Sequence, residues 1–89
     1  MYSSDEEKLL TERELEVLDC LHNGYSNPKI ADYLCITVST VKAHLSSIFR
    51  KLGAENRVDT LLILLGEKEI SNNFVKEQIA SLTNKIVHK

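Results

Sequence analysis

The chain has 89 residues, of which 43% are hydrophobic and 27% are charged, and its formal net charge is −2 at pH 7. This length allows one small domain with a single core, and it excludes a large catalytic cleft or a closed barrel. The charge is −5 over residues 1–28, +3 over residues 29–57 and zero over residues 58–89, so the small negative total does not exclude a nucleic-acid partner.

The first predicted helix covers about residues 12–22. Thr11 is placed as its N-cap, and Glu14 three residues later completes a capping box. Asn23 and Gly24 supply a stop signal after the helix. Its mostly apolar face, which we expect to point into the core, carries Leu10, Glu14, Val17, Leu18 and Leu21.

Two further helices are predicted over about residues 28–34 and 38–52. Ser26 or Asn27 caps the shorter helix, and Thr37 caps the longer one. The inward face of the longer helix carries Val41, His44, Leu45, Ile48 and Leu52. The opposite face carries Ser39, Lys42, Ala43, Ser46, Ser47 and Arg50. The longer helix therefore presents one mostly apolar face and one polar face.

A fourth helix is predicted over about residues 57–65, between an Asn56 cap and Gly66, and a fifth over about residues 71–87. The fifth helix has an apolar stripe at heptad-like spacing, formed by Val75, Ile79, Leu82 and Ile86. The sequence therefore predicts an all-α fold. The chain divides into an acidic N-terminal extension, a four-helix domain and an additional C-terminal helix, at residues 1–8, 9–66 and 67–89.

Residues 27–46 have the pattern of a helix–turn–helix. Residues 35–37 form a short turn between two helices, and Ala31 is the small residue where the helices cross closely. Such a turn sets the helices at about 90–120°, so the second helix can enter a DNA major groove about 12 Å wide while the first crosses the backbone. The motif therefore predicts a DNA-binding protein.

A family resemblance rests on motifs in a fixed order, namely Thr11-Glu12-Arg13-Glu14, Val17-Leu18, Gly24-Tyr25-Ser26-Asn27, Ile30-Ala31, Ile36, Thr40-Val41-Lys42, His44, Ile48, Lys51-Leu52-Gly53 and Arg57. Over about residues 9–65 the chain resembles the LuxR/NarL/GerE-type helix–turn–helix family. The resemblance implies a four-helix DNA-binding domain of bacterial transcription regulators. It also implies a homodimer through the helix at residues 57–65, bound to double-stranded DNA at an inverted-repeat promoter site.

The resemblance also implies individual roles in DNA binding. The base-contacting positions fall on Lys42, Ala43 and Ser46. Lys42 can donate to guanine, Ala43 can contact a thymine methyl group, and Ser46 can hydrogen-bond to several bases. Arg50 lies one turn beyond Ser46, within reach of a base or a phosphate. Lys29 departs from the family pattern but suits a phosphate contact at a helix start. The positions with a backbone-contacting role are Ser26, Asn27, Ser39, Thr40, Lys51 and Arg57.

Two apolar surfaces each have two interpretations. The first is an outward-facing stripe on the fourth predicted helix, formed by Val58, Leu62 and Leu65. This stripe either pairs two copies of the chain or is covered by the additional C-terminal helix. The stripe over residues 75–86 is a seam between subunits that aids this pairing, or it packs on its own domain.

Catalytic and metal-binding patterns are missing from the sequence. The carboxylates of the first helix have no accompanying nucleophile motif or glycine-rich phosphate loop. Cys20, His22, Cys35 and His44 lack the paired spacing of a zinc site. We therefore expect no enzyme, no metal and no cofactor. The two cysteines are interpreted as small apolar fillers, and His44 as a buried or half-buried histidine.

The sequence also predicts the cellular compartment of the protein. The longest apolar run, residues 61–65, is too short to cross a bilayer, and no signal-peptide pattern is seen. Two cysteines without a secretory segment favour a reducing compartment. We therefore expect a cytoplasmic protein without membrane contact.

Two other functions fit the same helices. One is a protein-interaction module, an anti-activator that forms heterodimers with a related regulator, as the negative total charge and the apolar stripes suggest. The other is a fold like region 4 of a sigma factor, which would contact RNA polymerase as well as promoter DNA. The variant Lys42→Ala separates the regulator from the anti-activator. If the protein is a DNA-binding regulator, this variant should lose DNA recognition. If it is an anti-activator, the variant should still form heterodimers.

Overall fold

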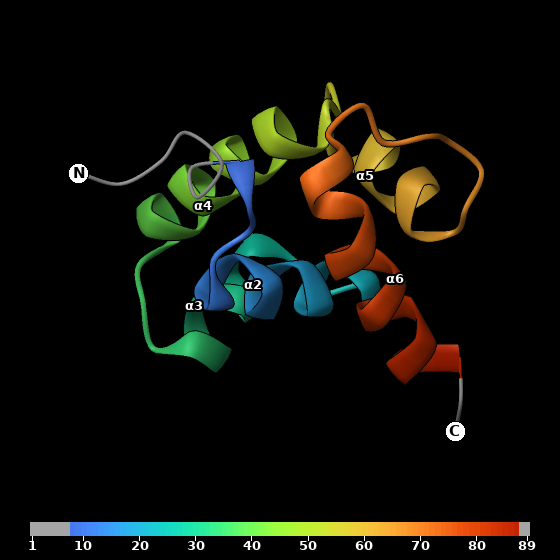
Figure 1. The fold of residues 1–89 in the computed structure, drawn as a ribbon. Coiled ribbons are helices and arrows are strands. Elements are labelled where there is room, and N and C mark those ends of the chain that lie inside the picture. The colour runs from blue at the N-terminus through green and yellow to red at the C-terminus, as the bar shows by residue number, and fades with distance from the viewer. Residues whose placement is uncertain (1–7, 88–89) are drawn as a thin grey trace.

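The computed structural model describes residues 8–87, with side chains described as far as residue 82. The described chain is helical and has no strand, which confirms the all-α prediction. The helices are α2 (Glu12–His22), α3 (Asn27–Leu34), α4 (Val38–Leu52), α5 (Arg57–Leu64) and α6 (Asn73–Val87) (Figure 1). No helix within residues 8–87 has the length and apolar character needed to cross a membrane.

The helix starts follow from local capping. Thr11 and Glu14 form the predicted capping box at α2, and Thr37 and Asn56 cap α4 and α5 as predicted. Ser26, one of the two predicted alternatives, caps α3, so this helix begins at Asn27. The first three helices therefore begin and end within one residue of their predicted limits.

The start of α6 lies two residues later than predicted. Ser71 is placed against Gly53, where an added Cβ would come within 2.5 Å of the Ser71 hydroxyl oxygen. The Asn72 side chain then accepts a hydrogen bond of 2.9 Å from the Phe74 amide. Gly53 also ends α4 with a φ of 73°, a conformation that favours glycine. The chain therefore turns at the end of α4 and passes back over this end before α6 begins.

The core lies where α4 packs against α2 and α3 (Figure 1). The inner faces of the three helices supply its fully buried side chains, which include Val17, Leu18, Leu21, Ile30, Val41, Ile48 and Leu52. These are the apolar positions that the helical periodicity predicts. Burial of one face of α4 leaves its other face at the surface.

A left-handed residue makes the turn between α3 and α4. Cys35 has a φ of 58° and is the single non-glycine with a positive φ in residues 8–87. The Ile36 amide donates to the Ala31 carbonyl at 2.9 Å and closes the turn. The predicted helix–turn–helix is thus present. The interpretation of Cys35 as an apolar filler is wrong, because the turn exposes it, whereas Cys20 is buried as expected.

Helix α6 packs on its own domain. Val75 and Ile79 are 0% and 5% exposed and belong to the same core as α2 and α4. The Gln78 side chain accepts from the Leu10 amide at 2.8 Å and donates to the Leu10 carbonyl at 2.9 Å. The interpretation of the 75–86 stripe as a seam between subunits is therefore wrong for the described side chains, since the apolar stripe is covered within one chain. Ile86 lies outside them.

The contact between Gln78 and Leu10 gives a testable expectation. Gln78→Ala leaves an amide and a carbonyl of Leu10 without partners in a partly buried place, and we expect it to lower the free energy of unfolding by about 1–2 kcal/mol. Urea denaturation followed by circular dichroism measures this change. The control is Glu77→Ala, at an exposed position of α6, which should change stability by less than about 0.5 kcal/mol. Equal effects of the two variants would contradict the expectation.

Candidate nucleic-acid interface

The exposed face of α4 holds the predicted base-contacting residues. Lys42, Ala43, Ser46 and Arg50 are all exposed, while the opposite face of the helix is buried. Within residues 8–82, no group pairs with the Lys42 ammonium. The face is therefore a polar and basic surface of a size and shape that a major groove admits.

The start of α4 adds hydroxyl groups to this face. Ser39 is exposed in the first turn. The Thr37 hydroxyl accepts from the Thr40 amide at 3.1 Å, and the two threonine hydroxyls lie 2.9 Å apart. The N-terminus of a helix carries partial positive charge and free amide donors, which suit a phosphate.

The start of α3 holds three of the predicted phosphate contacts. Ser26 accepts from the Lys29 amide at 3.3 Å. The Lys29 ammonium lies 4.3 Å from the centre of the Tyr25 ring, a cation–π contact at the surface. Asn27 is half-buried, and its side-chain oxygen accepts from the Arg57 guanidinium at 2.9 Å.

Arg57 connects α5 to α3 in this structure. Besides Asn27, its guanidinium donates to the Tyr25 carbonyl. The family resemblance implied phosphate contacts for Arg57 and Asn27, and the structure brings the two side chains together as partners of each other. Both therefore hold the start of α3 in place.

Lys51 is engaged inside the domain. Its ammonium donates to the Glu14 carboxylate at 2.8 Å and to the Leu9 carbonyl at 2.9 Å, and its side chain is 10% exposed. A phosphate at Lys51 would compete with the Glu14 carboxylate for the same ammonium. The structure thus assigns its charge to the junction of α2 and α4 rather than to the outer surface.

Glu14 was predicted only as a capping residue, and it does more. It is 4% exposed, and its carboxylate also accepts from the Ser47 hydroxyl at 2.5 Å. Burial alone would raise the pKa of Glu14, but hydrogen bonds from Lys51, Ser47 and the Thr11 amide outweigh it, and the pKa is lowered from its ordinary value of 4.5. One sequence signal could have indicated this buried role, namely the position of the Glu14 carboxylate on an otherwise apolar helix face.

An apolar edge remains open on α5. Val58 and Leu65 are 64% and 67% exposed, and Leu62 is partly buried. The interpretation in which the C-terminal helix covers this edge is wrong for Val58 and Leu65. The opposite side of α5 faces the core through Thr60 and Ile63. The Thr60 hydroxyl donates to the Asn56 carbonyl at 3.0 Å.

The histidine and cysteine side chains considered for a metal site do not form a cluster in the described part of the chain. His44 is half-buried on the inner side of α4. In the described part of the chain, no group of three histidine, cysteine or acidic side chains is placed to hold a metal ion.

A helix–turn–helix whose second helix presents a basic, polar and otherwise unoccupied face defines a DNA-binding domain. Residues 8–64 match the family model described as bacterial regulatory proteins, luxR family. The chain belongs to this family of transcription regulators. No solved structure matched the chain.

Curated relatives agree with this membership. The chain is 45% identical over 60 residues to the CsgBAC operon transcriptional regulatory protein of Escherichia coli, covering 67% of this chain and 28% of the relative. It is 39% identical over 66 residues to the oxygen regulatory protein NreC of Staphylococcus aureus, covering 74% and 30%. It is 40% identical over 70 residues to the nitrate/nitrite response regulator protein NarP of Escherichia coli, covering 76% and 33%. The matches thus span a third or less of these relatives.

Proposed function

We propose that the chain regulates transcription by placing α4 in the major groove of promoter DNA, with two copies on an inverted repeat. The observation that carries the proposal is an exposed stripe on α4, formed by Lys42, Ala43 and Ser46. The opposite face of the same helix is buried in the core. The names of the relatives, which are transcriptional and response regulators, support it.

Each exposed side chain then has a role that fits its chemistry. Lys42 donates to guanine O6 or N7, Ala43 contacts a thymine methyl group, and Ser46 bonds to a base edge with little discrimination. The contacts to phosphates come from Ser26, Lys29, Ser39 and Thr40. Asn27, Lys51 and Arg57 position the helices that carry these contacts, because their polar groups are paired inside the domain.

Pairing of two copies is assigned to the exposed edge of α5. Val58 and Leu65 are large apolar residues at the surface, flanked by the half-buried Leu62. A two-fold contact there would place two recognition helices about 34–36 Å apart, one turn of DNA.

Selection from a random duplex pool at physiological salt tests the proposal. We expect enrichment of an inverted repeat whose half-sites are about one helical turn apart. Enrichment of a single half-site would support DNA reading and contradict pairing through α5. No enrichment from folded protein would contradict the proposal altogether.

The second candidate function is the anti-activator. The open apolar edge of α5 favours it, because the same edge can pair with a related regulator. Heterodimer formation with no selected DNA sequence would support this function over direct regulation.

A further inference from the structure

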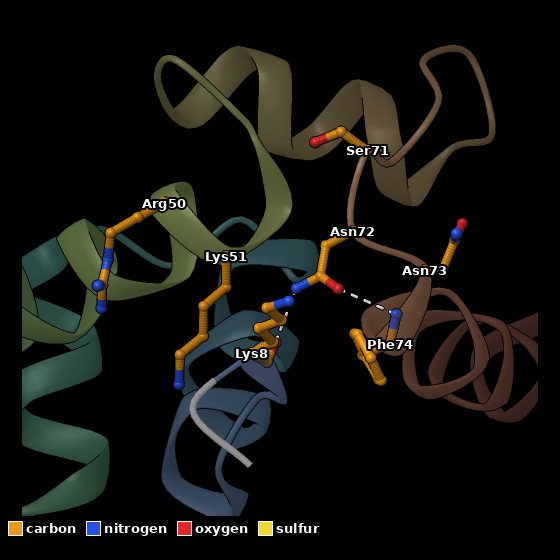
Figure 2. Close-up of a pocket in the computed structure, with 7 residues that line it drawn as sticks. All are labelled: Lys8, Arg50, Lys51, Ser71, Asn72, Asn73 and Phe74. Atoms are coloured by element: carbon orange, nitrogen blue, oxygen red, sulfur yellow. Dashed lines mark hydrogen bonds between the residues drawn. The ribbon is translucent and has the colours of Figure 1, made fainter. Parts of the chain in front are cut away.

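A pocket of about 590 Å³ lies between the end of α4 and the start of α6 (Figure 2). Arg50 and Lys51 line it from α4, residues 71–74 line it from the other side, and Lys8 lies between them. Residues 71–74 fall outside the segment that matches the family model, residues 8–64. The pocket is therefore built in part by the C-terminal segment that this chain adds to the family domain.

The charge on this pocket is positive. No carboxylate lines it among the described residues. Lys51 is neutralised by Glu14, which leaves the charges of Lys8 and Arg50. Arg50 is exposed, and among the described residues its guanidinium makes one long hydrogen bond, donated to the Ser47 hydroxyl at 3.4 Å. Among the described residues, Lys8 and Arg50 thus line the pocket without an acidic partner.

Contacts within the pocket fix its shape. The Asn72 amide group donates to the Lys8 carbonyl at 2.8 Å, and the Asn72 side-chain oxygen accepts from the Phe74 amide at 2.9 Å. The Lys8 ammonium lies 5.2 Å from the centre of the Phe74 ring. The backbone of Lys8 is therefore tied to the start of α6, and its charge is held at the pocket.

We propose that this pocket holds a backbone phosphate of the DNA that α4 reads. The inference rests on the proposed function and extends the contact surface beyond the helix–turn–helix. Arg50 belongs both to the pocket and to the exposed stripe of α4, eight residues after Lys42. Eight residues span about 12 Å along a helix, which is more than half the width of the major groove. With Lys42 at the bases, Arg50 therefore lies far enough along α4 to reach a phosphate at the edge of the groove.

The ligand chemistry agrees with this placement. A guanidinium fork binds two phosphate oxygens, and an ammonium adds a point charge on the same anion. The N-terminus of α6, a helix of 15 residues, lies at the pocket and adds partial positive charge. The C-terminal segment thus gives the domain a second anchor on DNA, next to the recognition helix.

The salt dependence of DNA binding tests this anchor. Each phosphate contact contributes about one to the slope of log K against log salt concentration. On the selected duplex, we expect Lys8→Gln to lower the slope by about one and to leave the preferred sequence unchanged. Lys8→Arg should keep the slope of the original protein. Lys76→Gln, which removes a charge that is also exposed but lies on α6 outside the pocket, is the matched control and should also keep the original slope.

Other outcomes would overturn the inference. An unchanged slope in Lys8→Gln, or an equal loss in Lys76→Gln, would remove the pocket from the DNA contact. Protection of the protein against thermal unfolding by inorganic phosphate alone, with no change of slope in Lys8→Gln, would assign the pocket to a free anion instead. Failure of the proposed function is distinguishable, because then the original protein would select no sequence.

Discussion

Replacement of Lys42 by alanine is expected to remove sequence-specific DNA binding and leave the fold intact. Lys42 is exposed on the α4 stripe and has no partner within the described chain, so its loss costs no internal contact. A side chain that donates to a guanine edge contributes about 1–3 kcal/mol of discrimination, or roughly 5- to 150-fold in affinity. Fluorescence anisotropy with the selected duplex and with a scrambled duplex measures the effect.

Lys29→Ala is the matched control for this variant. It removes the same charge from the start of α3, where we place a phosphate contact, so both duplexes should lose affinity to a similar extent. Lys42→Ala should weaken binding to the selected duplex far more than to the scrambled one. An equal loss on both duplexes would mean that Lys42 contacts phosphate rather than a base.

Glu14→Ala is expected to cause the largest loss of stability. The carboxylate is buried and accepts from Lys51, Ser47 and the Thr11 amide, and its removal leaves a nearly buried ammonium without a counter-charge. Breaking a buried pair on one side costs about 3–5 kcal/mol, which is a large part of the stability of a small domain. Urea denaturation at neutral pH measures the difference.

An exposed glutamate on the same helix provides the comparison. Glu16 is paired with Arg13 at 3.4 Å on the surface, and Glu16→Ala should change stability by less than about 1 kcal/mol. A similar loss in the two variants would mean that Glu14 acts only through helix propensity.

The same carboxylate predicts a dependence on pH. The hydrogen bonds from Lys51 and Ser47 outweigh the opposing effect of burial and hold the pKa of Glu14 below its ordinary value of 4.5. The folded state therefore gains stability from Glu14 at pH values above 4.5, and this gain is lost as the pH falls through the lowered folded pKa. The difference in stability between the original protein and Glu14→Ala should shrink in that acid range. A constant difference would contradict the assigned ionisation.

The parts of the structure that the sequence predicted well depend on near neighbours. Thr11, Thr37 and Asn56 act on amides three residues away, and the burial of α4 follows from spacings of three and four. Such signals need no knowledge of how the helices pack, so the helix limits and the exposed face of α4 were available from the sequence.

The pairings between distant residues were not available. Lys51 and Arg57 looked like free cations, but their partners Glu14 and Asn27 lie 37 and 30 positions away in the sequence. Gln78 bonds to Leu10 over 68 positions. These contacts depend on the packing of the helices, which periodicity alone does not specify.

The packing of α6 onto its own domain has a consequence for assembly. With Val75 and Ile79 enclosed, the α5 edge around Val58 and Leu65, the two large aliphatic residues most exposed in the described chain, is an apolar surface left for a second copy. Two such side chains cover far less than the roughly 800 Å² per partner of a stable interface. On adjacent half-sites, however, each copy meets the other at a high effective concentration. DNA would then act as the template that assembles the pair, and promoter occupancy would rise with nearly the square of the protein concentration.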